Sequence, residues 1–149
     1  MVPDDVARLV ADVFEAAGTL RRLGETTARA EGLTQARWQV LSVVSEQPVT
    51  VARAARRLGV SRQNVQRVAN DLTALRLAAY VPNPDHRSSP LLTLTPRGEE
   101  ALTRVTERAA ALHHALFATL PEEEIRATRA SLRRLLDETD GREGTRGKR

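Results

Sequence analysis

Five hydrogen-bonding side chains between residues 62 and 70 are of the types that read the edges of paired bases. They are Arg62, Gln63, Gln66, Arg67 and Asn70. Arginine pairs with guanine, and glutamine or asparagine with adenine, through two parallel hydrogen bonds each. At about 100° per residue these side chains share one side of a helix, opposite a stripe of apolar residues. The apolar residues are Val65, Val68, Ala69, Leu72 and Leu75. The spacing predicts an amphipathic helix whose polar face contacts double-stranded DNA; the alternative is an ordinary solvated face.

A cap and a short turn lie directly before this helix. Ser61 is a good N-cap, because its hydroxyl can accept from the unpaired N–H groups of a first helical turn. Gly59 stands where a preceding helix over residues 50–58 must end, since glycine reaches the left-handed conformation at little cost. Two helices joined in this way, over residues 50–58 and 61–77, are typical of a helix-turn-helix unit whose second helix enters a major groove.

The first of these two helices carries a basic stripe. Arg53, Arg56 and Arg57 stand at positions i, i+3 and i+4, so they lie on one side of it. Such a stripe can follow a phosphate backbone, and Ser61 at the start of the next helix can add a hydroxyl to the same contacts. We therefore expect these residues to hold phosphates. For each arginine the alternative is a plain solvated position.

After residue 77 the helical spacing gives way to two short strand-like runs, residues 79–81 and 91–94. The segment between them, PNPDHRSSP, is rich in turn formers, so the two runs predict a β-hairpin with a long tip. A hairpin directly after a recognition helix is a wing, and Arg87 at its tip is placed to enter a minor groove. Asp85 belongs to the same tip. His86 is either a second contact or simply exposed, and the lack of an obligate partner favours exposure.

Amphipathic helices flank this central unit on both sides. The predicted organisation is a helix within residues 1–33, a DNA-binding lobe over 34–95, two more helices over 96–139 and a disordered tail over 140–149, where apolar residues are missing. The lobe can close its own small core, but the flanking helices keep long apolar stripes that a second copy of the chain would cover. We therefore expect a homodimer with its two recognition helices about 34 Å apart. The alternative is a monomer whose flanking helices fold back on the lobe.

Composition bounds the other classes of function. The 149-residue chain has a net charge of +4, the sign expected of a nucleic-acid binder. It has no cysteine, which excludes disulfides and thiolate sites, and His113 and His114 point about 100° apart on a helix, so we expect no metal and no cofactor. No carboxylate pair or nucleophile elbow marks an enzyme. The lack of an apolar span and of a basic leader predicts a soluble, cytoplasmic protein with no membrane partner.

The order of elements and several short motifs resemble the MarR family of bacterial transcriptional regulators over nearly the whole chain. The motifs are Leu33-Thr34 before Trp38, then Leu58-Gly59-Val60-Ser61 with Val65 and Leu72, and finally Asp85-x-Arg87 followed by Leu94-Thr95 and Gly98. The last of these is the most diagnostic. The chain departs from the family pattern in two places: one extra residue separates Arg87 from Leu94, and Leu77-Ala78 stands where a glycine usually ends the recognition helix.

The resemblance implies a winged helix-turn-helix fold, mainly α with a small β-wing and with terminal dimerisation helices. It also implies that Arg87 enters the minor groove and that Asp85 helps to orient neighbouring arginines. Many family members release DNA when a small, often aromatic, ligand enters a cleft between the DNA-binding lobe and the dimer helices. The residues implied for such a cleft in this chain are Phe14, Trp38 and His113.

Together these observations predict a sequence-specific regulator of transcription, a homodimer that represses from a pseudo-palindromic operator and is released by a small ligand. The alternative from another class is a winged-helix module for protein interaction or dimerisation, without specific DNA readout. Such a module also occurs in the N-terminal part of some methyltransferases. The chain has no Gly-rich strand–helix unit for a cofactor, which counts against that alternative.

Overall fold

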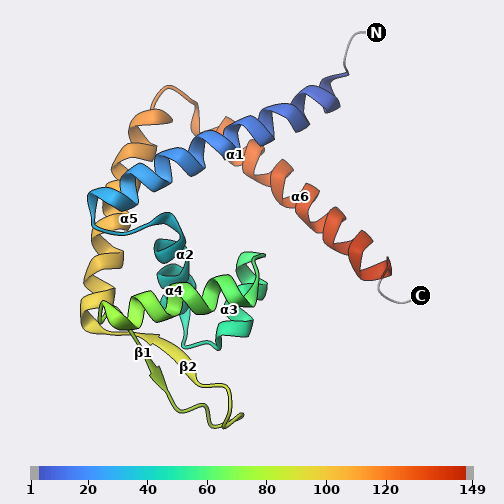
Figure 1. Ribbon diagram of the computed structural model, residues 1–149. Coiled ribbons are helices and arrows are strands. Elements are labelled where there is room, and N and C mark those ends of the chain that lie inside the picture. The colour runs from blue at the N-terminus through green and yellow to red at the C-terminus, as the bar shows by residue number, and fades with distance from the viewer. Residues whose placement is uncertain (1–3, 147–149) are drawn as a thin grey trace. The chain divides into compact units, whose positions relative to one another are not determined.

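The computed structural model describes residues 4–146, which form six helices and one two-stranded sheet (Figure 1). In chain order the elements are α1 (Asp5–Ala30), α2 (Gln35–Glu46), α3 (Val51–Leu58), α4 (Arg62–Ala74), β1 (Ala78–Val81), β2 (Leu91–Leu94), α5 (Pro96–Leu116) and α6 (Glu122–Arg146). The chain divides into two compact units, one that ends at Ala110 and one that begins at Ala111. None of the helices in residues 4–146 has the length and apolar character needed to cross a membrane.

The unit that ends at Ala110 has one hydrophobic core, to which every element from α1 to α5 contributes. Among its most deeply buried side chains are Leu41 of α2, Leu72 of α4, Leu92 of β2 and Val105 of α5. Burial of one side chain of this size contributes roughly 1.5–3 kcal/mol to stability. Because α4 and β2 share this core with α2, the helix that carries the candidate site and the hairpin beside it are held in one packed body.

Side-chain caps fix where the helices of this unit begin, and these caps are local in sequence. Asp4, Thr34, Thr50 and Ser61 each accept a hydrogen bond from the backbone N–H three residues further on. Thr95 does the same at the start of α5, at 3.1 Å. Each cap satisfies one of the N–H groups that a first helical turn leaves unpaired. The predicted cap at Ser61 is therefore confirmed.

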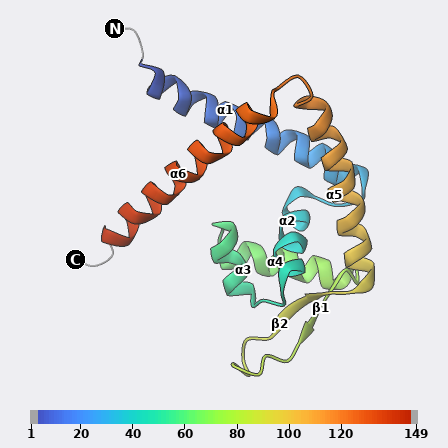
Figure 2. The ribbon, with the colours of Figure 1, turned by 180° about the vertical axis from the view of Figure 1, so that it is seen from behind.

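The predicted hairpin is present and is joined to the start of α3. Strands β1 and β2 pair antiparallel, with Tyr80 opposite Leu92. Val49, just before α3, forms an isolated bridge with Leu92, in which the two N–H···O bonds measure 2.7 and 3.2 Å. The hairpin extends beyond α3 and α4 when this unit is seen from the front or from behind (Figure 2). It is a wing whose base is fixed to the helix-turn-helix.

The end of α4 differs from the sequence prediction. The helix stops at Ala74, Leu75 is its C-cap, and Arg76 takes the left-handed conformation with a φ of 60°. The prediction that Leu75 continues the apolar stripe is wrong, since its side chain is 42% exposed. Leu75 is the last residue before the left-handed turn at Arg76 and lies at the end of the helix, beyond the buried stripe that ends with Leu72. The left-handed turn that a glycine would favour thus falls on Arg76, directly before Leu77-Ala78.

The predicted disordered tail also requires correction. Residues 140–146 continue α6 to Arg146, so the prediction of disorder is wrong there. The helix continues there although apolar residues are missing and two glycines disfavour it, and opposite charges four apart, at Glu138 and Arg142, favour it. The rest of the predicted tail, residues 147–149, lies outside the described residues.

Candidate nucleic-acid interface

The residues that α4 buries determine which side of the helix faces outward. Val65, Ala69 and Leu72 are at most 1% exposed, so side chains about half a turn away face solvent. All five predicted base-reading residues lie on the unburied side. Arg62, Gln63, Arg67 and Asn70 are exposed, and Gln66 is half-buried. The structure therefore gathers the predicted set on one face of one helix, with Gln66 at the flank nearest the wing.

A hydrogen-bonded cluster joins this face to the wing. The Nε2 atom of Gln66 lies 3.0 Å from Oδ1 of Asn70 and 3.0 Å from the hydroxyl of Tyr80 on β1. We call Gln66, Asn70 and Tyr80 the amide–hydroxyl cluster. Tyr80 was not singled out by the sequence pattern. A signal was available, because Tyr80 is the only tyrosine in the chain and stands on the strand that follows the recognition helix.

The opposite flank of α4 is held by α2. Nη2 of Arg37 on α2 lies 3.4 Å from a carboxylate oxygen of Asp71 on α4. On the outward face, Nη2 of Arg67 donates to Oδ1 of Asn64 at 3.1 Å. Contacts on both flanks thus restrict how α4 can turn about its own axis, and a helix that reads bases needs this restriction because its side chains must meet fixed positions in the groove.

The three arginines of α3 are not equivalent. Arg53 and Arg56 are exposed and make no ion pair or side-chain hydrogen bond within residues 4–146. The guanidinium of Arg57 is hydrogen-bonded to the carboxylate of Glu46 at the end of α2. That hydrogen bond lowers the pKa of the Glu46 carboxyl and raises the pKa of Arg57. At neutral pH both groups are therefore charged and paired, so among the three arginines of α3 only Arg53 and Arg56 offer an unpaired cation.

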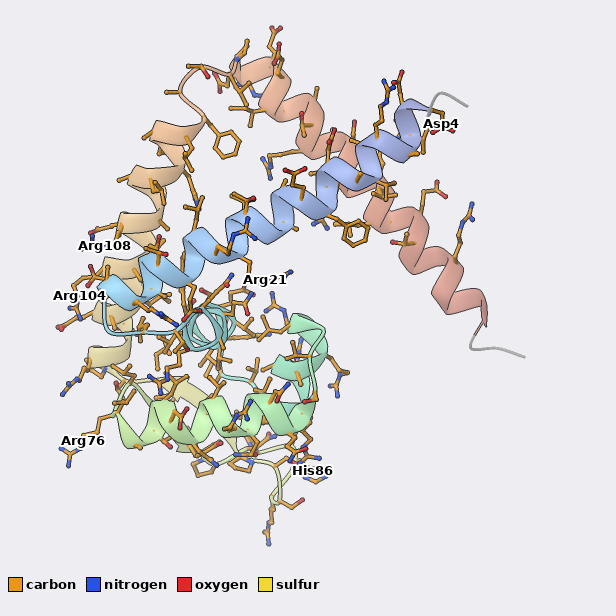
Figure 3. The ribbon with its side chains drawn as sticks, turned by 45° about the horizontal axis from the view of Figure 1, so that its top comes forward. Asp4, Arg21, Arg76, His86, Arg104 and Arg108 are labelled. Atoms are coloured by element: carbon orange, nitrogen blue, oxygen red, sulfur yellow. The ribbon has the colours of Figure 1, made fainter. Side chains whose placement is uncertain are left out.

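The wing tip is ordered by its own hydrogen bonds. Nδ2 of Asn83 donates to the Ser89 carbonyl at 2.9 Å, and its Oδ1 accepts from the backbone N–H of Asp85 at 3.1 Å. His86 is exposed on the wing (Figure 3), and its Nδ1 lies 3.0 Å from the Ser88 hydroxyl. Arg87 is exposed, and neither its guanidinium nor the Asp85 carboxylate makes an ion pair within the described residues.

A hollow of about 270 Å³ lies where α3, α4 and the wing meet. Polar side chains line much of it. They are Thr50, Arg62, Gln66, Tyr80, Ser88 and Ser89. Hydroxyls, one guanidinium and the N-terminal end of α3 are groups that bind phosphate oxygens. The hollow thus places phosphate-binding chemistry between the base-reading face and the wing tip. The Ser61 hydroxyl, predicted to touch phosphate, caps α4 by accepting from the Asn64 N–H at 3.1 Å, and its own O–H hydrogen remains available to donate.

Two hydrogen bonds and one close backbone contact join the base of the wing to the end of α4. The Thr95 hydroxyl donates to the carbonyl of Arg76 at 2.7 Å, and the Thr95 N–H donates to the carbonyl of Leu77 at 3.1 Å. Gly98, in the first turn of α5, packs on the same segment so closely that an added Cβ would lie 1.8 Å from the Leu77 oxygen. Figure 3 shows Arg76 at this end of α4. The glycine that the family motif contains is therefore required by a backbone-to-backbone contact.

The residue after α1 is tied to α5 within the same unit. Glu31 is mostly buried, and its carboxylate lies 3.5 Å from Nε of Arg104 and 2.9 Å from Nε of Arg108. Figure 3 shows these two arginines together on α5, beside the end of α1. Because α5 begins at the base of the wing, this ion pair and the core connect α1 with the wing through one helix.

The residues implied for a ligand cleft are only partly gathered. Trp38 lines a hollow of about 380 Å³ together with residues of α2, α3 and α5. Its other lining residues are Gln35, Gln39, Ser42, Val43, Leu58 and Thr106. Phe14 is not among them and is 76% exposed on α1. His113 is exposed and belongs to the unit that begins at Ala111.

Comparisons with known proteins agree with this geometry. A family model described as the MarR family matches residues 31–87. An uncharacterized protein of Mycobacterium tuberculosis is 58% identical over 133 residues, which cover 89% of this chain and 93% of that protein. The transcriptional activatory protein BadR of Rhodopseudomonas palustris is 35% identical over 95 residues, which cover 61% of this chain and 54% of BadR.

Solved structures share the fold at low sequence identity. BldR from Sulfolobus solfataricus matches with a TM-score of 0.82 and 16% identity, over 93% of this chain and 99% of that one. A mutant MarR from E. coli complexed with operator DNA matches with a TM-score of 0.78 and 19% sequence identity. The match covers 91% of this chain and 99% of that one. CouR from Rhodococcus jostii, bound to p-coumaroyl-CoA, matches with a TM-score of 0.75 and 20% sequence identity. The match covers 91% of this chain and 94% of that one.

The capped helix-turn-helix, the hairpin that follows it and these structural matches define a winged helix-turn-helix fold. The family model places residues 31–87 in the MarR family, and the chain shares its fold with solved MarR-family transcription regulators.

Proposed function

We propose that this chain is a sequence-specific regulator that binds a pseudo-palindromic operator in double-stranded DNA as a homodimer. The observation that carries the proposal is the outward face of α4, where five side chains able to read bases stand together on a helix held on both flanks. The E. coli MarR structure, which holds operator DNA, shares the fold. Binding of the purified protein to DNA from upstream of its own gene, measured at two salt concentrations, tests the proposal.

Each group of residues has a separate role in this proposal. The outward side chains of α4 contact base edges in a major groove, Arg53 and Arg56 hold phosphates, and Arg87 enters the adjacent minor groove. Arg57 contributes less than its two neighbours, because a phosphate would have to displace Glu46. His86 and Asp85 stand beside Arg87 at the wing tip, and Ser61 contributes by setting the start of α4.

The Arg57–Glu46 pair leads to a prediction of increased affinity. Replacing Glu46 with glutamine removes the charge that holds Arg57, so Arg57 becomes available to a phosphate. We expect binding to all duplexes to tighten by up to about fivefold, the upper range of an exposed ion pair, and the salt slope to steepen by about one. Fluorescence anisotropy over a series of salt concentrations measures both quantities.

A matched control removes the same charge from a different ion pair. Glu122 pairs with Arg126 on α6, and Glu122→Gln should leave the affinity and the salt slope unchanged. If Glu46→Gln behaves like this control, Glu46 and DNA phosphate do not compete for Arg57.

Exposed apolar side chains support the dimer. Helix α1 leaves several large apolar side chains in solvent, and α6 does the same. They are Val6, Leu9, Val10, Phe14 and Leu20 on α1, and Leu132, Leu135 and Leu136 on α6. Stripes of exposed large apolar side chains, taken on each helix by itself, are a feature of interaction sites. A second copy related by a two-fold axis would cover these residues and would place two recognition helices on successive major grooves.

A charged substitution in this surface should separate the dimer. We expect Leu9→Arg combined with Leu135→Arg to give a monomer in sedimentation equilibrium, with unchanged helix content, and to weaken operator binding roughly a hundredfold because the two half-sites are no longer linked. Ala11→Arg, which places the same charge about 200° around α1 from Leu9, should stay dimeric. A wild-type monomer, or a dimeric double variant, would remove the dimer from the proposal.

We further propose that binding represses transcription, since occupation of promoter DNA is sufficient for repression and needs no contact with polymerase. BadR carries the name of an activatory protein, so whether this chain lowers or raises transcription must be measured directly. In vitro transcription from a template that contains the operator should fall as the protein is added. A rise would establish activation and leave the DNA-binding part of the proposal intact.

The hollow beside Trp38 supports release by a small ligand. Its volume of about 380 Å³ lies within the range of sites for small molecules, and its lining mixes an indole and aliphatic groups with amides and hydroxyls. Trp38 is the only tryptophan, so its fluorescence reports directly on this site. We expect a small aromatic acid, with 4-hydroxybenzoate as the probe, to quench Trp38 and to release bound operator over the same concentration range. Quenching without release, or no quenching at millimolar probe, would contradict this expectation.

A further inference from the structure

The amide–hydroxyl cluster restricts what Gln66 can read. A glutamine side-chain amide has two N–H donors on its nitrogen and one acceptor oxygen. The Nε2 atom of Gln66 lies 3.0 Å from both Asn70 Oδ1 and the Tyr80 hydroxyl, so both donors are used inside the protein. The groups that remain are Oε1 of Gln66, which only accepts, Nδ2 of Asn70, which only donates, and the O–H hydrogen of Tyr80, whose oxygen accepts from Gln66.

Tyr80 is held firmly enough to impose this arrangement. It lies on β1 opposite Leu92, which is fully buried and also bridges to Val49 before α3. The end of β1 nearest α4 is fixed by the Thr95 contacts to the carbonyls of Arg76 and Leu77. The hydroxyl of Tyr80 therefore stands at a set position beside α4, and Gln66 is half-buried against it.

We propose that Tyr80 is a positioning residue for specificity, which turns Gln66 from a two-bond reader of adenine into a single acceptor. This inference rests on the proposed function. To recognise adenine with two hydrogen bonds, a glutamine amide must donate an N–H to N7 of the base and accept from its N6 amino group. The N–H donors of Gln66 are already occupied, so the first of these bonds is not available. A lone acceptor in the major groove matches the amino group of cytosine or adenine and is repelled by the carbonyl oxygens of guanine and thymine. Gln66 thus binds the amino group of cytosine or of adenine without distinguishing the two bases.

The substitution Tyr80→Phe tests this directly, because it removes the hydroxyl and keeps the ring. One N–H of Gln66 is then released toward N7, and adenine should become preferred over cytosine by about tenfold at the base that Gln66 reads. Gln66→Ala identifies that base as the one position where preference disappears. The measurement is the dissociation constant for duplexes that carry each of the four bases at every position of a selected operator half-site.

The control is Thr93→Val, which removes a hydroxyl from the other strand of the wing, at a residue that does not line the hollow shared by Gln66 and Tyr80. It should leave the ratio of adenine to cytosine binding unchanged, and circular dichroism should show all three variants folded. The inference is overturned if Tyr80→Phe leaves that ratio unchanged, if Gln66→Ala alters no position, or if the wild type prefers guanine or thymine there, since that result means the amide presents its nitrogen. Failure of the wild type to select any operator would instead overturn the proposed function.

Discussion

Replacing Gly98 with alanine should destabilise the unit that ends at Ala110 by about 3 kcal/mol or more, at or above the upper end of the usual cost of overpacking. The added Cβ would lie 1.8 Å from the carbonyl oxygen of Leu77 and 2.8 Å from its carbon. That carbonyl cannot move aside without breaking its hydrogen bond with the Thr95 N–H, which joins the wing to the end of α4. The gain of about 1 kcal/mol that alanine normally brings to a helix is too small to offset this clash.

Guanidinium unfolding followed by circular dichroism measures the effect as a lowered transition midpoint. Gly141→Ala is the matched control, because Gly141 also lies in a helix and a Cβ there meets nothing within 4 Å. We expect the control to unfold at or slightly above the wild-type midpoint. A Gly98→Ala protein with the wild-type midpoint would show that the contact with Leu77 does not fix the wing.

The largest expected effect on binding comes from removing two arginines of α4 together. Each specific arginine–guanine pair is worth about 1–3 kcal/mol, and Arg62 and Arg67 share no partner within residues 4–146, so their effects should add. We expect Arg62→Ala combined with Arg67→Ala to weaken operator binding between about thirtyfold and about twenty-thousandfold. Binding to a scrambled duplex should fall far less, because phosphate contacts by Arg53 and Arg56 remain.

The control for this double variant removes the same two charges elsewhere. Arg21 on α1 and Arg129 on α6 are both exposed and make no ion pair within the described residues. Arg21→Ala combined with Arg129→Ala should change the affinity for operator and scrambled duplexes by a similar small factor. Equal losses for both duplexes in the Arg62/Arg67 variant would assign these arginines to phosphates instead of bases.

Features that depend on near neighbours in the chain were predictable from the sequence. The caps at Thr34, Thr50 and Ser61 act over three residues, and the left-handed turn at Gly59 needs only its own backbone, with a φ of 67°. The apolar spacing of Val65, Ala69 and Leu72 was sufficient to show which side of α4 faces outward, because helical geometry relates them directly.

Contacts between residues that are distant in the chain were not predictable in this way. Tyr80 meets Gln66 only because β1 returns beside α4, and Arg57 meets Glu46 only because α3 crosses the end of α2. The motif that contains Gly98 pointed to an important glycine, but the reason, a clash with the Leu77 carbonyl, is visible only in three dimensions. The sequence patterns specify which side chains α4 presents, and the tertiary contacts decide which of their donors and acceptors remain available.

The most direct measurement is selection of duplexes from a random pool by the purified wild-type protein, followed by the affinity ratio of the selected to a scrambled sequence. If the outward face of α4 reads bases in duplicate, the selected sequences contain an inverted repeat with half-site centres about 10 base pairs apart, and the ratio is about a thousandfold or more. No enriched sequence, with equal affinity for both duplexes, would contradict base readout by α4 and would favour a protein-interaction module.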